Sequence, residues 1–152
     1  MIALDDIDRA LIRAMRADSS RSAALLGEQV GLSQPACWRR IDRLMKSGVI
    51  RSRRVRLNGE KLGFGVTVFL GVKLAVRGRT SLEEFERAVS AIPEVLIVHH
   101  VLGLYDYRLK VVARDLADFE RILRRRIMTL PAVGDIESNV QLSEEKDSGP
   151  LV

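Results

Sequence analysis

The chain has 152 residues, 47% of them hydrophobic, which is enough for one ordinary domain or two small ones with buried cores. No stretch approaches the roughly 18 consecutive apolar residues of a membrane span, and the start "MIALDDIDRA" is acidic rather than signal-like. We therefore expect a cytoplasmic protein without a membrane partner. A single cysteine and two adjacent histidines favour neither disulfides nor a metal site, and we expect no cofactor.

The positive charge is confined to the first part of the chain. Residues 1–60 carry 12 Lys and Arg against 7 Asp and Glu, whereas residues 61–152 carry 13 of each kind. This asymmetry predicts a polyanion partner for the amino-terminal part. The glycine-containing stretch "LNGEKLGFG" interrupts both helical and strand patterns, so we expect two domains, residues 1–60 and 61–152.

Three helices are predicted in the first domain. In "LDDIDRALIRAMRAD" apolar residues recur every four positions, with Asp5 suited to the N-cap and an end around Asp18. The second helix runs from about Ser22 to Val30 and ends at a glycine. The third is capped by Ser33, holds a proline in its first turn and continues to Gly48.

Two short helices joined by "VGLS" are typical of a helix-turn-helix, and Gly27 suits their close crossing. Cys37, Ile41 and Leu44 form the inward stripe of the third helix, so its polar side faces outward. Arginine pairs with guanine and glutamine with adenine, so this side is expected to contact DNA through Ser33, Gln34, Pro35, Trp38, Arg39, Arg43 and Lys46. At least one of Arg39 and Arg43 should reach a base edge. The alternative is a solvated basic helix.

The next stretch, "VIRSRRVRLN", alternates apolar residues with arginines and predicts a short basic ribbon, the wing of a winged helix-turn-helix. Arg51, Arg53 and Arg54 are expected to hold phosphates rather than to read bases. The alternative is a charged edge strand that resists aggregation.

The second domain contains an internal repeat. "SLEEFERAVSAIPEV" and "DLADFERILRRRIMTLPAV" align, the second with four more residues, about one helical turn. Each helix is expected to begin at a capping residue, Ser81 or Asp115, followed three positions later by an acid. Strand-like sequence surrounds both: "TVFLGVKLAV", "VLIVHHVL", "DYRLKVVA" and "GDIESNVQL". The order predicts an α+β chain with a ferredoxin-like βαββαβ sandwich.

The predicted sheet has helices on one face only, yet its first two strands are apolar on both faces. Val68 and Leu70 alternate with Phe69, and in the second strand Leu96 and Val98 alternate with Ile97. The uncovered face predicts a homodimer that packs sheet against sheet. Such a dimer would present two DNA-reading modules at once.

Several stretches together resemble the Lrp/AsnC, or feast/famine, family of bacterial and archaeal transcription regulators. They are "LDDIDRALI", "VGLSQPACWRRIDRL", "GVI", "VLGLYDYRLKVV" and "LPAVGDIES", and the resemblance extends from about Leu4 to Lys146. It implies a winged helix-turn-helix that binds double-stranded operator DNA, and a ferredoxin-like, RAM-type domain that dimerises and senses amino acids or related molecules. It also implies that dimers assemble further into octamers.

The resemblance places an effector pocket at the turn between the second and third strands, at Gly103, Leu104, Tyr105, Asp106 and Tyr107. Backbone N–H groups of a tight turn can hold a carboxylate, and Asp106 can pair with an ammonium group, so an amino acid suits both. The family commonly has a polar residue where this chain has Leu104. The alternative is an ordinary hairpin in which Asp106 satisfies the backbone.

We expect a sequence-specific regulator without catalytic residues, but two other classes remain open. Sirohaem decarboxylases resemble the same two-domain architecture and use His and Arg, and here only His99 and His100 could serve as histidine donors. Their adjacency in a strand points them to opposite faces. That activity would leave the amino-terminal charge without a purpose. An amino-acid-binding module without DNA activity would be expected to lack the basic helix.

Overall fold

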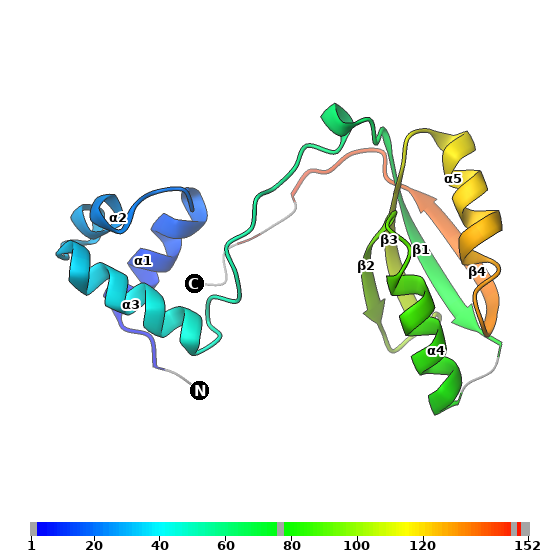
Figure 1. The fold of residues 1–152 in the computed structure, drawn as a ribbon, viewed down its shortest axis with the longest axis horizontal. Coiled ribbons are helices and arrows are strands. Elements are labelled where there is room, and N and C mark those ends of the chain that lie inside the picture. Colours follow the sequence, from blue (N-terminus) through cyan, green and yellow to red (C-terminus); the bar gives the residue numbers. More distant parts are fainter. Residues whose placement is uncertain (1–2, 76–77, 147–148, 150–152) are drawn as a thin grey trace. The chain divides into compact units, whose positions relative to one another are not determined.

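A computed structural model of the chain describes residues 3–75, 78–146 and 149 (Figure 1). In chain order the elements are α1 (Asp6–Ala17), α2 (Ala23–Val30), α3 (Gln34–Lys46), a 3₁₀ turn (Glu60–Leu62), β1 (Val66–Leu74), α4 (Arg79–Ser90), β2 (Val95–His100), β3 (Tyr107–Ala113), α5 (Leu116–Ile122) with a π-helical continuation (Leu123–Ile127), and β4 (Val133–Val140). Within the described ranges, none of the helices has the length and apolar character needed to cross a membrane.

The first two helices begin where the sequence predicts. The Asp5 carboxylate accepts the N–H of Asp8 at 2.7 Å, and the Asp8 carboxylate accepts the N–H of Asp5, which completes a capping box. The Ser22 hydroxyl accepts the N–H of Leu25, and α2 ends at Gly31 with a left-handed φ of 71°. Ser33 stands at the N-cap of α3, as predicted, but its side chain makes no capping hydrogen bond.

The three helices share one apolar core. It consists of Leu11, Ala14, Met15, Leu26, Cys37, Ile41 and Leu44. The inward stripe predicted for α3 is therefore confirmed, and the opposite side of the helix is left for solvent or a partner.

Gly27 lies where α2 crosses the start of α3. A Cβ atom at this position would lie 2.6 Å from the carbonyl oxygen of Leu32 and 3.4 Å from Cβ of Cys37. The Leu32 N–H donates to the Gly27 carbonyl at 2.8 Å, so the backbone of the turn is held against the helix. The close crossing that the sequence predicts is therefore present and requires glycine.

Gly27→Ala is expected to destabilise the first three helices by about 1 kcal/mol or more. Overpacking typically costs about 1–3 kcal/mol, and the better helix propensity of alanine recovers at most about 1 kcal/mol. Urea unfolding followed by the fluorescence of Trp38, the single tryptophan, measures the change. Glu28→Ala, an exposed neighbour in α2, is the control and should stay within about 0.5 kcal/mol of wild type. An unchanged midpoint for Gly27→Ala would contradict the crossing.

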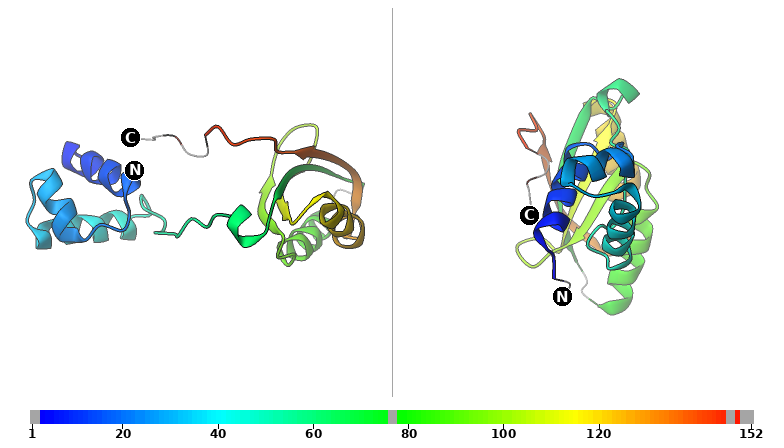
Figure 2. Two further views of the ribbon diagram at one scale, coloured as in Figure 1. Left: turned by 90° about the horizontal axis from the view of Figure 1, so that it is seen from above. Right: turned by 90° about the vertical axis from the view of Figure 1, so that its left-hand side faces the viewer.

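The second half is the predicted βαββαβ unit. Its four strands are all antiparallel in the order β2-β3-β1-β4. Helices α4 and α5 lie on the same face of this sheet, as the two views agree (Figure 2). The split arrangement places β1 and β3 in the centre and leaves β2 and β4 at the edges.

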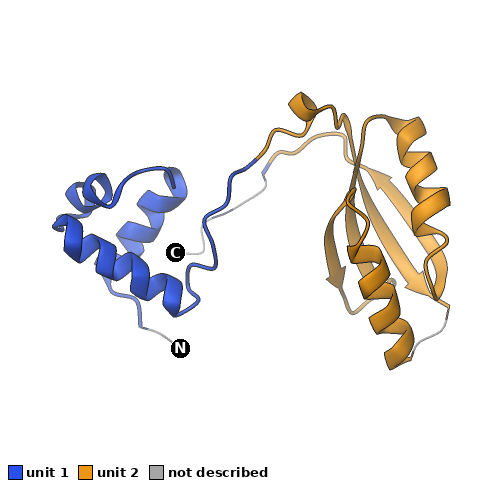
Figure 3. Cartoon of the chain, viewed as in Figure 1, with its two compact units in different colours: residues 1–56, 146–152 blue, residues 57–145 orange. Residues whose placement is uncertain are grey.

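The chain separates into two compact units (Figure 3). The first comprises residues 3–56 together with Lys146 and Gly149, and the second comprises residues 57–145. The sequence suggests a boundary after residue 60, whereas the division along the chain falls between Arg56 and Leu57. In the first unit, Nη2 of Arg16 donates to the carbonyl oxygen of Gly149 at 2.6 Å.

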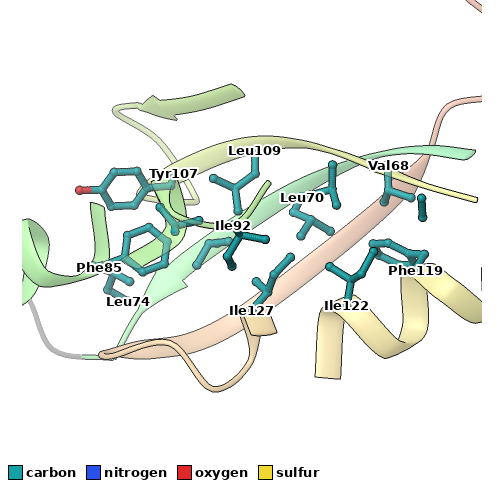
Figure 4. Packing of buried hydrophobic residues seen from close by; sticks show 14 residues of the cluster. Val68, Leu70, Leu74, Phe85, Ile92, Tyr107, Leu109, Phe119, Ile122 and Ile127 are labelled. Carbon is teal, nitrogen blue, oxygen red and sulfur yellow. The ribbon is translucent and has the colours of Figure 1, made fainter. Parts of the chain in front are cut away.

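The core of the second unit lies between the sheet and its two helices (Figure 4). The rings of Phe85 and Tyr107 pack together at one end, with centroids 4.7 Å apart. Phe119 lies near Val68 at the other end. Helix α5 is capped as predicted, since the Asp115 side chain accepts the N–H of Asp118 at 2.7 Å.

Two local expectations are wrong. Residues 51–58 form no strand, so the predicted wing ribbon is absent, and the segment runs as extended chain with Val55 and Leu57 exposed. A two-stranded ribbon needs an apolar face that packs on something, and here only Ile50 packs on the helical core. Helix α4 begins at Arg79, so Ser81 lies inside the helix and does not cap it.

The uncovered face of the sheet is less apolar than the sequence suggests. Phe69 is exposed there, but Arg108 and Lys110 of β3 stand beside it, paired with Gly71 and Phe69 in the register. A bulge at Leu96 shifts the alternation of β2, so that Val95 and Val98 both pack against the core. The strict two-face pattern predicted for β2 is therefore wrong.

Candidate functional site

The outward side of α3 carries every side chain that the sequence predicts there. All of the following are exposed: Ser33, Gln34, Pro35, Trp38, Arg39, Arg43 and Lys46. They are brought together because the helical repeat turns Cys37, Ile41 and Leu44 into the core. The result is a polar, net basic helix face of the size that enters a DNA major groove.

An ion-pair network ties this helix to the start of α1. Nη1 of Arg40 donates to the Asp5 carboxylate at 2.6 Å and to the Asp8 carboxylate at 2.8 Å, and Arg43 donates to the other oxygen of Asp8. The Asp8 side chain is fully buried. The hydrogen bond from Arg40 holds the pKa of Asp5 below its usual value, and the same bond raises the pKa of Arg40.

Sequence reasoning missed Asp8 and Arg40. A signal was present, because Asp5 and Asp8 are three residues apart on one helix, and Arg40 and Arg43 are three apart on another. Pairing them requires knowledge of how the helices cross, which the sequence alone does not supply.

The network divides the basic residues of α3 by what they already bind. Arg43 is held by Asp8, although about half of its side chain remains exposed, and Lys46 pairs with Asp42 at 2.8 Å. In the part of the chain that the structure describes, Arg39 takes part in no ion pair. Of the two arginines predicted to reach a base, Arg39 is therefore the one whose donors are uncommitted.

Arg51, Arg53 and Arg54 are exposed on the extended segment after α3. Arg53 turns back toward the helices, because it lines a groove together with Trp38 and Met45. Arg53 thus stays near the outward face of α3 although the expected ribbon is absent, whereas Arg54 lines a second groove with side chains of α1.

The turn between β2 and β3 is fixed to β1 by Asp106. The Asp106 carboxylate accepts the N–H of Leu74 at 2.8 Å, its N–H donates to Val72, and its carbonyl accepts from Val101, both at 2.9 Å. Leu74 lies where the register of β1 with β4 shifts, so the carboxylate satisfies a backbone group at an irregularity. Asp106 therefore satisfies backbone groups, as expected if this turn were an ordinary hairpin.

The two tyrosines of this turn point to opposite sides of the sheet. Tyr105 covers Gly71 on the open face and donates to Glu137, and this hydrogen bond raises the pKa of Tyr105. Tyr107 is fully buried on the helix face, where its hydroxyl donates to Glu86 at 2.7 Å. Burial is the main cause that raises the pKa of Tyr107.

The five residues predicted for an effector pocket are thus not gathered into one cluster. Gly103 and Leu104 are exposed in the turn, while Tyr107 is a core residue that an effector cannot touch in this arrangement. The prediction that Tyr107 lines the pocket is therefore corrected, because the core of the second unit encloses its ring. The two histidines also diverge as expected. In the strand register His99 lies opposite Arg108, whereas the His100 ring stacks on Tyr107.

Comparison with known proteins identifies both units. The family model of the Lrp/AsnC ligand binding domain matches residues 67–151, and that of the AsnC-type helix-turn-helix domain matches residues 4–45. The chain is 36% identical over 146 residues to the proline dehydrogenase transcriptional activator of Rhizobium radiobacter, covering 96% of this chain and 94% of that protein. It is also 36% identical to the leucine-responsive regulatory protein of Haemophilus influenzae, covering 99% of this chain and 90% of that protein.

Solved structures agree in fold. An AsnC family transcriptional regulator from Agrobacterium tumefaciens superposes with a TM-score of 0.89 at 34% identity, covering 98% of this chain and 97% of that one. A transcriptional regulator from Neisseria meningitidis, solved as a complex with L-Met, gives 0.92 at 26% identity, covering 99% and 97%. The two curated relatives are transcriptional regulators rather than enzymes. The chain therefore belongs to the Lrp/AsnC family, and it is a DNA-binding transcriptional regulator with the helix-turn-helix and ligand binding domains of that family.

Proposed function

We propose that this regulator reads its operator through the exposed face of α3, with Arg39 as the principal base-contacting residue. The observation that carries this proposal is that Asp8 holds Arg43, whereas Arg39 has no ion pair in the described ranges. An uncommitted guanidinium can donate two hydrogen bonds to one guanine in the major groove. Gln34, five residues earlier in the first turn of α3, is also exposed, and we assign it a second base contact. Ser33, Pro35, Lys46, Arg51 and Arg54 are assigned to the DNA backbone.

Arg39→Ala is expected to reduce discrimination between operator and random DNA about tenfold or more, because a bidentate base contact is worth about 1–3 kcal/mol. The operator is obtained by letting the protein select duplexes from a random pool, and discrimination is the ratio of the two dissociation constants. Arg87→Ala removes an exposed arginine from α4 and is the control, which should leave the ratio unchanged. A variant that keeps the wild-type ratio would exclude Arg39 as the base reader.

We further propose that the second unit binds an amino acid at the turn of residues 103–106. The match to the Lrp/AsnC ligand binding domain and the L-Met complex of the Neisseria relative support this. Exposed backbone at Gly103 and Leu104 can receive a carboxylate, and Tyr105 and Asp106 flank it. Because Asp106 also binds the Leu74 N–H, a ligand that reorients its carboxylate would act on β1 at the same time.

Thermal unfolding in the presence of each of the twenty amino acids tests this second proposal. A ligand present at about 100 times its dissociation constant adds about 2.7 kcal/mol to the free energy of unfolding, which is a readily measured shift. Leu104→Glu should abolish the shift by placing a carboxylate near the ligand's own, whereas Leu116→Glu, at another exposed leucine outside the turn, should not. If no amino acid shifts the transition, the proposed effector class is wrong.

We also propose a homodimer that packs the open sheet face, from which octamers assemble. Phe69 and Ile97 are exposed apolar side chains of this face, and an apolar sheet surface in water favours a second copy. In such a dimer, acidic or polar groups of the second copy would have to compensate the charges of Arg108 and Lys110 on β3. Light scattering of the protein reports the assembly. Because we propose that its target is DNA, we also propose that the protein is located in the cytoplasm.

A further inference from the structure

A groove of about 450 Å³ opens between α3, the start of α2 and the segment after α3. Its apolar part is formed by Trp38, Ala23 and Met45, and its polar part by Ser20, Ser22 and Arg53. These residues all belong to the first unit. The groove therefore lies between the outward side of α3 and the basic segment of residues 51–58, for which the sequence predicted a ribbon.

Trp38 is the unusual residue of this groove. The indole is 59% exposed, and Met45 beside it is 42% exposed, although large apolar side chains are usually buried. The exposed indole is a flat apolar surface within a net basic unit. It would gain free energy from a partner that is apolar where it meets the ring and anionic nearby.

The charges of the groove favour an anion at one place. Arg21 is engaged by Asp18 and Gln29, and the Asp42 carboxylate is paired with Lys46. Arg53 makes no ion pair within the described residues. The uncommitted positive charge of the groove is therefore at Arg53, which lines the same groove as the indole.

We propose that this groove seats one sugar-phosphate unit of the DNA backbone, with the Trp38 ring against the deoxyribose and Arg53 on the phosphate. The inference deepens the DNA-binding role of α3 and rests on it. It assigns Trp38 to positioning rather than to base reading, because sugar and phosphate are the same at every step of the duplex. Trp38 then sets the register in which Arg39, the next residue, meets the bases.

The single tryptophan makes the proposal directly measurable. A random-sequence duplex of about 20 base pairs, which spans two helical turns, is titrated at low salt into the wild-type protein, and Trp38 emission is recorded together with the anisotropy of the labelled DNA. We expect the emission to change in step with the anisotropy. Trp38→Ala should weaken binding to random DNA and to a pool-selected operator by the same factor, about tenfold for the apolar ring surface that the sugar covers, and Trp38→Phe by less.

Arg53→Ala is the second variant, because it removes the uncommitted charge of the groove and leaves the indole in place. It should lower the slope of log affinity against log salt by about one unit per protomer, whereas Arg87→Ala in the other unit should not. Thermal unfolding of Trp38→Phe should match wild type, since the indole is exposed.

Three results would overturn the inference. Emission that stays constant while anisotropy rises means that DNA binds without entering the groove, and the DNA-binding assignment survives. A Trp38→Ala variant that loses affinity for the operator but not for random DNA makes Trp38 a base reader. If wild type shows no anisotropy change with either duplex, DNA binding through α3 fails, and this inference fails with it.

Discussion

Asp8→Ala is expected to lower the free energy of unfolding of the first unit by about 1.5–3 kcal/mol, because it removes a buried carboxylate that accepts charge-assisted hydrogen bonds from two arginines. The Asp8 carboxylate is fully buried and accepts from both Arg40 and Arg43, and it also accepts the backbone N–H of Asp5 in the capping box. Its loss leaves Arg43 without its ion-pair partner and Arg40 with Asp5 alone at the junction of α1 and α3. Urea unfolding followed by Trp38 emission measures the effect.

Asp6→Ala is the matched control, since Asp6 is an exposed acid in the same helical turn. It should cost no more than about 1 kcal/mol, the usual contribution of an acid near a helix amino terminus. Equal midpoints for the two variants would show that the buried carboxylate contributes no more than the exposed one. The second unit should unfold in its own transition, unchanged in both variants.

The same network predicts a loss of function that is larger than the loss of one side chain. Arg40 and Arg43 are on α3, the helix that we propose faces DNA, and their bonds to Asp5 and Asp8 fix the rotation of that helix relative to α1. Without these ion pairs α3 can adopt several orientations, so Arg39 is not held in one position. Fixing one orientation on binding then costs conformational entropy. Asp8→Ala should therefore weaken operator binding even at temperatures where the variant remains folded.

Acidification should act on the same junction through Asp5. Its pKa is lowered in the folded chain by the hydrogen bond from Arg40, so the folded state binds fewer protons there than the unfolded state. The stabilisation is present above the unfolded pKa of about 3.9 and is lost as the pH falls below it. Near neutral pH this group therefore contributes no pH dependence.

The features that the sequence predicted correctly depend on neighbours along the chain. The caps at Asp5, Ser22 and Asp115 form within four residues, and the inward stripe of α3 follows from the helical repeat alone. The order of strands and helices followed from an internal repeat. These signals survive folding because no distant residue competes with them.

The wrong expectations depend on tertiary partners. The wing at residues 51–58 alternates correctly but has no surface on which a ribbon could pack, and the bulge at Leu96 is decided by pairing with β3. The commitment of Arg43 depends on an acid 35 positions earlier. Tyr107 is different: it shares a strand face with Leu109 and Val111, so its burial was readable from the alternation in "YRLKVVA".

Salt should change DNA affinity more than any single substitution. If each protomer neutralises three to five phosphates, a dimer makes about 6–10 contacts, and raising the salt from about 50 to about 200 mM should lower affinity by about 10³–10⁵-fold. Arg51, Arg53 and Arg54 are exposed on the segment after α3, and we propose them as the main source of these contacts. The slope of log affinity against log salt is the measured quantity.

The triple variant Arg51→Ala, Arg53→Ala and Arg54→Ala should reduce that slope by about three units per protomer, because each lost contact releases about one counterion fewer. Arg87→Ala, Arg121→Ala and Arg125→Ala, three exposed arginines of the second unit, remove the same charge elsewhere. This control should leave the slope nearly unchanged, since exposed charges beyond about 10 Å are screened at moderate salt. Equal slopes for the two triple variants would mean that net charge, rather than contact by the segment after α3, attracts the DNA.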